Sequence, residues 1–155
     1  MIWGSIIGTQ KGPFMIWEKG WGNINSEKYC DRILPLIMSV KAEHPEMILM
    51  QDGAPPHTAR RTREALQNVG IDLLNWPPFS PDLNPIESLW DTLKDYLQSH
   101  YPDIDIQSQM PSTRFHEIIQ EAWDSITLHE IERVIGSMPE RCQAVIKAEG
   151  GHTKY

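Results

Sequence analysis

Two acidic residues, Asp52 and Glu87, have types and spacing that could serve chemistry, with 34 residues between them. Asp52 follows the apolar run "MILMQ", and Glu87 follows the proline-rich stretch "WPPFSPDLNPI". In an open α/β sheet, functional groups gather beyond the carboxyl ends of the strands, so we expect the two carboxylates to meet at one sheet edge. Two hard oxygen ligands suit Mg²⁺ or Mn²⁺, which serve phosphoryl transfer. The pair therefore predicts a metal site for that chemistry.

Both carboxylates also have a purely structural interpretation. Glu87 lies three positions after Asn84, a spacing at which the carboxylate supports the start of a helix and needs no metal. Asp52 precedes Gly53, and an Asp in that position is commonly a turn former. Spacing alone leaves both interpretations open for each residue.

A basic cluster follows Asp52, although the chain as a whole is acidic, with a formal net charge of -7. Phosphate contacts come chiefly from Lys and Arg, so a chain of this charge can contact DNA only locally. The candidate nucleic-acid-binding residues are His57, Arg60, Arg61 and Arg63. A charge run is usually a solvated face, and His57 after two prolines could equally cap a helix or lie at the surface.

The first half of the chain shows both strand and helix patterns. Residues Ile2–Ile7 and 13–17 have the composition of short strands around the Gly-containing turn "GTQKG", which predicts a hairpin. Apolar residues then recur at helical spacing after the cap candidates Asn25 and Ser26, and Pro35 should kink this helix.

A strand, a helix and a second strand are predicted around Asp52. Residues 47–51 form a continuous apolar run typical of a buried strand, and the following "DGAPPHT" has the composition of a loop. A helix over residues 58–68 ends at Gly70, and residues 71–74 form the next strand. Such a unit is a right-handed parallel crossover. Because Asp52 directly follows the first strand, it should lie at the carboxyl end of that strand.

The second half of the chain predicts only helices. The helix that carries Glu87 should begin at Pro85 with Asn84 as its cap. Its apolar stripe consists of Ile86, Leu89, Trp90, Leu93 and Leu97. Two further helices are predicted over residues 115–126 and 128–138, and the ending "EGGHTKY" is typical of an exposed tail.

Length and composition favour one domain over residues 1–155. A chain of 155 residues that is 40% hydrophobic can bury one core. No apolar run approaches the roughly 20 residues that span a bilayer, and the start lacks the basic flank of a signal peptide, so we expect an intracellular protein without a membrane segment. Cys30 and Cys142 stand alone, which indicates reduced thiols and no zinc site.

Several segments resemble the catalytic domain of mariner-superfamily DNA transposases. They are "QDGAPPHTA" from Gln51 and "WPPFSPDLNPIESLW" from Trp76, together with the interval between Asp52 and Glu87. The segments "WGSI", "KGPF" and "GGHTKY" are similar to flanking parts of the same domain. The resemblance implies an α/β, ribonuclease-H-like fold with a mixed sheet flanked by helices. It also implies a DDE site, in which two Asp and one Glu bind two divalent metals, Mg²⁺ or Mn²⁺.

By this resemblance Asp52 matches the second acidic ligand and Glu87 the third. The loop that presents Glu87 is then supported by Trp76, Pro81, Asn84 and Pro85. The first ligand does not carry over, because in the family it lies on the first, central strand, upstream of the segment similar to "MIWGSI". We therefore expect a single DDE domain that is incomplete at its amino end. Its four strands should show a gap or an unusual direct pairing.

The function implied by the resemblance is that of the catalytic domain of a cut-and-paste DNA transposase, which cleaves DNA, transfers strands and integrates the element. Without the first Asp, we expect this chain alone to be inactive. The implied partners are transposon-end DNA, target DNA and a second copy in a homodimer, in the nucleus of a eukaryotic host or otherwise in the cytoplasm. Two alternatives stay open: a non-catalytic DNA-binding or interaction protein derived from a transposase, and a ribonuclease-H-like nuclease without strand transfer.

Overall fold

The computed structural model describes residues 1–103 and 111–155, which divide into two units. The first unit comprises Met1–Ile16 and Asp82–Tyr155, and the second comprises Trp17–Pro81. Each unit contains a two-stranded ladder together with helices. The predicted α/β class is therefore confirmed.

The first unit begins with an antiparallel hairpin made of β1 (Ile2–Ile7) and β2 (Gln10–Ile16). Ile7 pairs with Gln10 across a two-residue turn, in which Gly8 has a φ of 56°, a left-handed conformation that glycine adopts without strain. The predicted hairpin is confirmed. Its second strand starts at Gln10 and not at Pro13, because the short turn brings residues 10–12 into the ladder.

The described part of the first unit also has four α-helices, and the 3-10 turn η2 leads into the first of them. The turn η2 spans Pro81–Leu83, and the helices are α5 (Pro85–His100), α6 (Ser112–Ser125), α7 (Leu128–Gly136) and α8 (Met138–Lys147). The first three helices were predicted, but α8 was not. The helix predicted over residues 128–138 ends at Gly136, and Pro139 lies in the first turn of a new helix, a position that suits proline because its missing N–H is not needed there.

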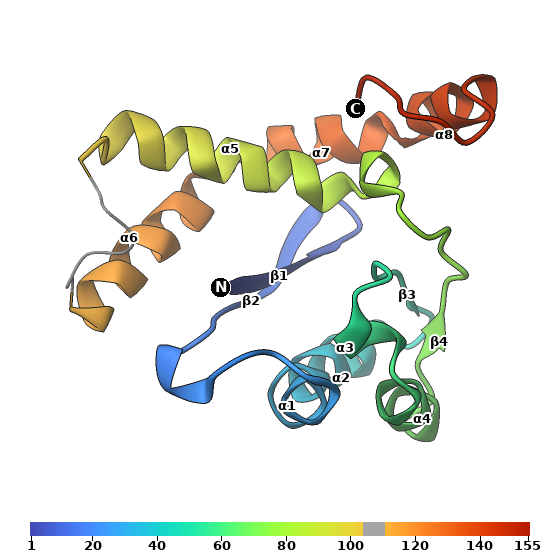
Figure 1. Ribbon diagram of the computed structural model, residues 1–155, viewed down its shortest axis with the longest axis horizontal. Coiled ribbons are helices and arrows are strands. Elements are labelled where there is room, and N and C mark those ends of the chain that lie inside the picture. Colours follow the sequence, from blue (N-terminus) through green and yellow to red (C-terminus); the bar gives the residue numbers. More distant parts are fainter. Residues whose placement is uncertain (104–110) are drawn as a thin grey trace. The chain divides into compact units, whose positions relative to one another are not determined.

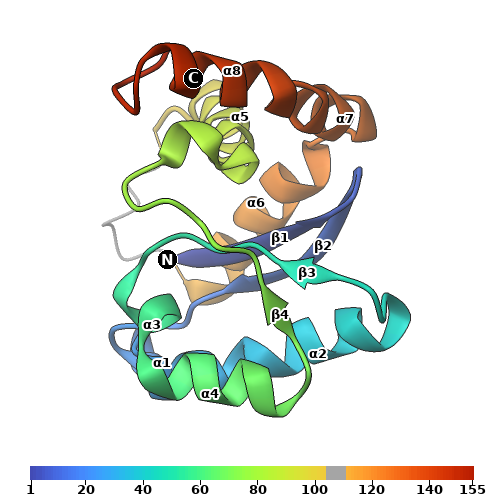
Figure 2. The same cartoon turned by 90° about the vertical axis from the view of Figure 1, so that its right-hand side faces the viewer.

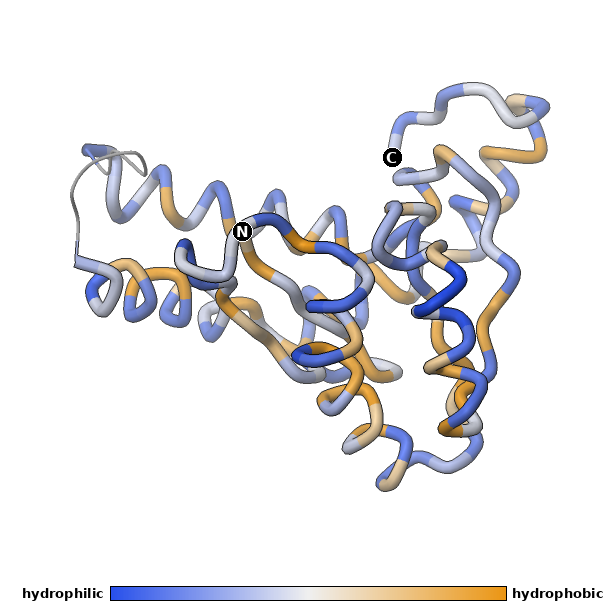
Figure 3. Tube along the Cα trace, turned by 60° about the horizontal axis from the view of Figure 1, so that its bottom comes forward, coloured by the Kyte–Doolittle hydropathy of each residue, from blue (hydrophilic) through white to orange (hydrophobic). Residues whose placement is uncertain are grey.

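The core of the first unit lies where α5, α6 and α7 pack together and α7 packs on β2 (Figure 1). Its buried residues are Leu89, Leu93, Ala122, Trp123, Ile126, Ile131 and Val134. Phe14 of the hairpin stacks on Trp123 with ring centroids 4.6 Å apart, and Trp90 lies 5.5 Å from the same ring. Along α5 and α6, hydrophobic and hydrophilic residues alternate with the helical turns, as predicted (Figure 3).

The second unit starts with the 3-10 turn η1 (Lys19–Trp21), followed by α1 (Ser26–Arg32) and α2 (Leu34–Glu43). The Asn25 side chain caps α1 by accepting a hydrogen bond from the Lys28 backbone N–H at 2.9 Å. The two helices are separated at Ile33, and Pro35 falls in the first turn of α2. The predicted cap and the predicted interruption at Pro35 are both confirmed.

A parallel crossover completes the second unit. The strands β3 (Ile48–Leu49) and β4 (Asp72–Leu73) pair in parallel, and the helices α3 (Pro55–Thr58) and α4 (Arg60–Asn68) connect them. Figure 2 shows α1, α2 and α4 on one side of this ladder. The strand–helix–strand order is as predicted, but each strand is shorter than its apolar run. The prediction that "DGAPPHT" is a loop was wrong for Pro55–Thr58, which form α3 because proline suits the first turn of a helix.

The four strands form two separate ladders and not one continuous sheet. In residues 1–103 and 111–155, β1 pairs only with β2, and β3 pairs only with β4. One ladder is antiparallel and the other parallel, which is the predicted mixture of strand directions. The gap between them stays a prediction, because the two ladders belong to different units. A two-stranded ladder leaves backbone donors and acceptors unpaired along its outer edges.

No helix in the described segments is long and apolar enough to cross a bilayer.

The ending "EGGHTKY" is exposed at residues 149–152 and at Lys154, as predicted, but Thr153 and Tyr155 connect it to other residues of the first unit. The Thr153 hydroxyl donates a hydrogen bond to the Asp82 carboxylate at 2.9 Å, and the Tyr155 hydroxyl donates to Glu140 at 3.3 Å. Thr153 and Tyr155 are accordingly half-buried. Composition could not indicate these two contacts, because it does not report hydrogen bonds to residues far away in the chain.

Candidate functional site

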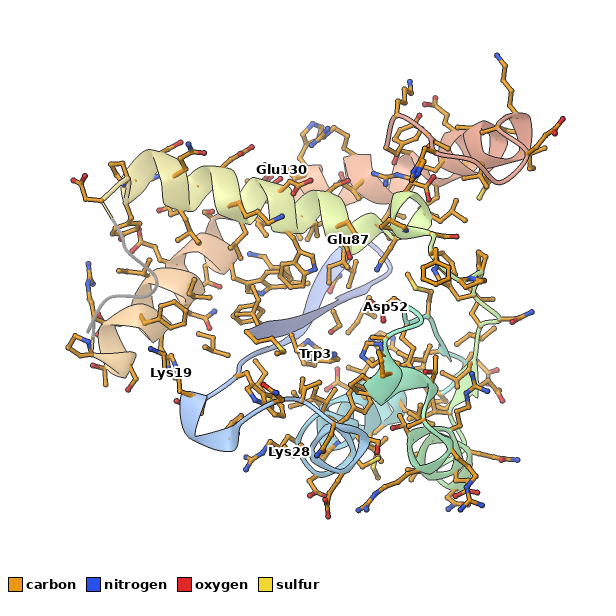
Figure 4. All side chains as sticks on the ribbon, viewed as in Figure 1. Trp3, Lys19, Lys28, Asp52, Glu87 and Glu130 are labelled. Carbon is orange, nitrogen blue, oxygen red and sulfur yellow. The ribbon has the colours of Figure 1, made fainter. Side chains whose placement is uncertain are left out.

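Asp52 lies three residues beyond β3, in the loop that leads into α3 (Figure 4). Its Oδ1 accepts a hydrogen bond from the Ala54 backbone N–H at 3.0 Å. The same oxygen forms a hydrogen bond with His57 Nδ1 at 2.6 Å. The Asp52 side chain remains 49% exposed. Asp52 is therefore a turn former, as one interpretation held, and its carboxylate is also fixed in orientation.

The ring of His57 contacts two segments of the second unit, Asp52 in its own loop and Tyr29 in α1. Tyr29 of α1 meets it edge-on with ring centroids 4.9 Å apart, and the Tyr29 hydroxyl donates to Gln51 Oε1 at 2.8 Å. Burial, with smaller effects from Cys30 and Asp52, raises the pKa of the Tyr29 hydroxyl well above its usual range. The Tyr29 hydroxyl therefore stays protonated near neutral pH and can donate its hydrogen bond. That His57 contacts DNA stays a prediction, and the structure engages its Nδ1 with Asp52.

Glu87 lies in the first turn of α5, near the positive end of the helix dipole (Figure 4). Asn84 occupies the cap position, but its side chain makes no capping hydrogen bond, so the prediction of a side-chain cap was wrong. The reason is local. Pro85 has no N–H, and the N–H of Glu87 donates to the backbone oxygen of Asn84 at 3.2 Å. Within the described residues, Asn84 Oδ1 is buried without a partner.

The four residues expected to support the loop differ in burial. Asn84 and Pro85, in the first unit, are buried, whereas Trp76 is half-buried and Pro81 is exposed in the second. Asn84 and Pro85 therefore fit their expected role most directly. Support of the loop by Trp76 and Pro81 stays a prediction.

Sequence reasoning missed Arg141, which supports the segment that carries Glu87. Its guanidinium donates hydrogen bonds to the backbone oxygen of Asp82 at 2.9 Å and to Ser88 Oγ at 2.8 Å. Arg141 is only 5% exposed. The one signal available was the motif "GGHTKY", whose Tyr155 lies against Arg141 with the guanidinium 4.9 Å from the ring centroid.

The basic cluster lies on α4 and is exposed. Arg60 is 3.6 Å from Glu64, and Arg61 is 3.8 Å from Glu27, while Arg63 is exposed on the same helix. Ion pairs between exposed side chains of this kind are worth little, so they do not prevent the arginines from binding phosphate. Their contact with DNA stays a prediction.

The donor set fits a hard divalent cation, because carboxylate oxygens are the ligands that Mg²⁺ and Mn²⁺ prefer. Both contacts of Asp52 use Oδ1, which leaves Oδ2 available to a ligand. Within the described residues, no three His, Cys, Asp or Glu side chains form a metal-binding group. Asp52 belongs to the second unit and Glu87 to the first, and their convergence stays a prediction.

Comparison with protein families gives a match to the model of the DDE superfamily endonucleases over residues 7–108, a range that includes both carboxylates. The chain belongs to this family. Its relatives include the Tc1 transposase of Caenorhabditis elegans, 33% identical over 156 residues, and the Tcb2 transposase of Caenorhabditis briggsae, 31% identical over 156 residues. Each alignment covers 100% of this chain and 54% of the relative. The chain therefore spans about half the length of the curated relatives it matches.

The fold is similar to that of the Mos1 transposase catalytic domain, solved with raltegravir and Mn. The TM-score is 0.79 at 19% identity, covering 99% of this chain and 76% of that chain. The Mos1 paired-end complex with the left transposon end matches with the same TM-score at 20% identity, covering 97% of this chain and 44% of that chain. The predicted ribonuclease-H-like fold is thus confirmed.

Proposed function

We propose that this chain is the catalytic part of a cut-and-paste DNA transposase, with Asp52 and Glu87 as metal ligands. The observation that carries the proposal is the state of Asp52. It follows a parallel strand, two donors fix its Oδ1, and its Oδ2 is available. It also lies within the range matched by the DDE family, and so does Glu87. DNA transposase relatives over the whole chain support the same function.

Divalent metals bound in such a site would activate water and stabilise the attacking and leaving oxygens during in-line displacement at a DNA phosphodiester. The chain's own residues would hold and orient those ions. Ala54 and His57 orient the Asp52 carboxylate, and the first turn of α5 carries Glu87. Mg²⁺ or Mn²⁺ is the proposed ion, which is consistent with Mos1 catalytic domains solved with Mn and with Mg.

The proposed partners are transposon-end DNA, target DNA and a second copy of the chain, and the proposed location is the nucleus of a eukaryotic host. The Mos1 structures with a left transposon end and in a strand transfer complex support the DNA partners. We also propose that these 155 residues alone are inactive, because none of them matches the first carboxylate of a DDE site. Two carboxylates give each metal fewer anionic ligands than the reaction needs.

The metal proposal is tested by Mn²⁺ titration of the chain, followed by line broadening of backbone amide signals in NMR. We expect weak binding, with a dissociation constant of about 1 mM, the range of sparsely furnished hard-cation sites. Asp52→Asn and Glu87→Gln should each reduce the broadening near the changed residue. Matched controls are Asp72→Asn in β4 and Glu132→Gln in α7, both exposed. Equal loss of broadening in the controls would contradict the proposal.

Activity is tested with transposon-end DNA in Mg²⁺ or Mn²⁺. The unmodified chain should neither cleave this DNA nor join strands. Metal-dependent nicking that disappears in Glu87→Gln would show that the chain is active, and it would support the site while overturning the proposed inactivity.

A second candidate function, non-catalytic DNA binding, is favoured by the exposed arginines of α4. Binding by Arg60, Arg61 and Arg63 should be weak, and log K should fall with log salt with a slope of about -3, close to one unit per neutralised phosphate. Changing all three to Gln should remove most of that slope. Changing Lys19, Lys94 and Lys147 to Gln removes the same charge from other exposed positions and should leave the slope unchanged. DNA binding equally weakened by the lysine variant would refute a role of α4.

A further inference from the structure

The start of α5, which carries Glu87, lacks a side-chain cap. The Asn84 side chain makes no capping hydrogen bond, although Pro85 suits the first helical position because its missing N–H is not needed there. An uncapped first turn frays readily, because its backbone donors have no partners inside the helix. Hydrogen bonds from residues outside the helix can therefore help to order this turn.

Arg141 of α8 supplies that support. Its guanidinium spans the segment, donating through Nη1 to the backbone oxygen of Asp82 at 2.9 Å and through Nη2 to Ser88 Oγ at 2.8 Å. Nε donates to Ser137 Oγ at 2.8 Å, so three nitrogens of the planar group are engaged. Asp82 and Ser88 lie on either side of the uncapped helix start, and Ser88 is adjacent to Glu87.

The guanidinium is buried for a structural reason that composition did not reveal. Arg141 is 5% exposed, and desolvation lowers the pKa of its guanidinium, although an arginine remains charged at any ordinary pH. A buried charge is tolerated only when its donors are paired. The three hydrogen bonds meet that requirement, and they tie α8 to the segment that leads into α5.

The C-terminal segment, residues 149–155, contacts both Asp82 and Arg141. Thr153 Oγ1 donates to Asp82 Oδ2 at 2.9 Å, so Asp82 is held through both its backbone and its carboxylate. The ring of Tyr155 lies 4.9 Å from the Arg141 guanidinium, and its hydroxyl donates to Glu140 Oε2 at 3.3 Å. Residues of α8 and the C-terminal segment therefore converge on the start of α5.

We propose that Arg141 is a positioning residue for Glu87, acting with Thr153 and Tyr155 through Asp82 and Ser88. This inference rests on the proposed function, since it assigns a purpose to fixing Glu87. A metal ligand on an uncapped turn would bind poorly, because the turn would have to be ordered each time an ion bound. The Arg141 guanidinium orders the first turn of α5 before an ion binds. Lys at this position keeps the charge but cannot bond to Asp82 and Ser88 together.

Hydrogen exchange of backbone amides tests the positioning role in the chain itself. Arg141→Lys should speed exchange of residues 84–90 by about tenfold, as the loss of one hydrogen bond to a charged group implies. Exchange in α6 should not change. Arg133→Lys makes the same substitution at an exposed position of α7 and is the control. Thr153→Val is a second, milder variant that should affect the same residues, with the exposed Thr113→Val as its control.

A metal readout distinguishes positioning from general stabilisation. In Arg141→Lys, Mn²⁺ should broaden the amide signals of Glu87 and Ser88 less than in the unmodified chain, while broadening around Asp52 persists. Unchanged exchange over residues 84–90 in both Arg141→Lys and Thr153→Val overturns the inference, and so does faster exchange throughout the first unit. Broadening that stays the same at Glu87 also overturns it. If Mn²⁺ broadens nothing near Glu87 in the unmodified chain, the proposed metal site fails, and the exchange rates decide the positioning role alone.

Discussion

The contact between Asp52 and His57 makes a prediction that separates two kinds of side chain at position 57. In asparagine, Nδ2 is attached to Cγ and takes nearly the place of the histidine Nδ1, which lies 2.6 Å from Asp52 Oδ1. In glutamine the amide nitrogen lies one bond further out, nearer the place of Nε2. His57→Asn should therefore keep the donor to Asp52, and His57→Gln should lose it.

The size of the effect follows from the surroundings of the pair. A hydrogen bond to a charged group contributes about 1.5–3 kcal/mol when it is shielded from water. Here the Asp52 side chain is 49% exposed and that of His57 is 18% exposed, so solvent screening reduces the contribution to about 1 kcal/mol. Both variants lose the ring contact with Tyr29, at 4.9 Å between centroids. The difference between the variants therefore isolates the hydrogen bond.

Exchange of the Ala54 amide is the local assay, because this N–H donates to the same Asp52 Oδ1 at 3.0 Å. If His57 fixes the carboxylate, the Ala54 amide should exchange about fivefold faster in His57→Gln than in His57→Asn, the ratio that corresponds to about 1 kcal/mol. Mn²⁺ broadening at Gly53 should be weaker in His57→Gln. Identical Ala54 exchange in the two variants would falsify the idea that His57 orients Asp52.

Two further predictions concern the first unit. A Cβ added at Gly4 would lie 2.8 Å from the Trp90 ring, so Gly4→Ala should lower the free energy of unfolding by about 1–3 kcal/mol, measured by urea denaturation, and an unchanged midpoint would contradict this packing. Hydrogen bonds from the Thr127 backbone N–H and hydroxyl lower the pKa of Glu130, so its ionised form stabilises α7 above the unfolded pKa. Glu130→Gln should thus cost about 0.5 kcal/mol at pH 7, and the difference should vanish as the pH falls through the lowered pKa; a difference that persists at pH 2 would refute it.

The elements that the sequence predicted well are those with a signal inside a few residues. The hairpin, the interruption before Pro35 and the crossover with Gly70 at the end of its helix each depend on local backbone preferences. The strand lengths were overestimated. The run at residues 47–51 was predicted to be a buried strand, but Ile48 is 61% exposed. A strand also needs a neighbour to pair with, and β3 pairs with β4 over only two residues.

In the candidate site, too, local signals identified some residues and missed others. Asp52 and Glu87 could be chosen from their motifs, but the partners that orient them could not. The contact between Asp52 and His57 depends on how the chain turns through Pro55 and Pro56, and the hydrogen bond from Arg141 to Asp82 joins residues 59 positions apart. No periodicity in the sequence encodes such a pair, because both residues also fit ordinary surface positions.

The structural and catalytic interpretations of Asp52 turn out to be compatible, because a carboxylate has two oxygens. Oδ1 accepts from Ala54 and His57 and shapes the turn, which leaves Oδ2 pointing from a fixed side chain. At the start of α5, the N–H of Glu87 likewise serves the backbone turn at Asn84 by donating to its backbone oxygen at 3.2 Å. A turn that immobilises a ligand lowers the entropy lost when a metal binds. A structural role for these residues is therefore part of the case for the proposed site and does not compete with it.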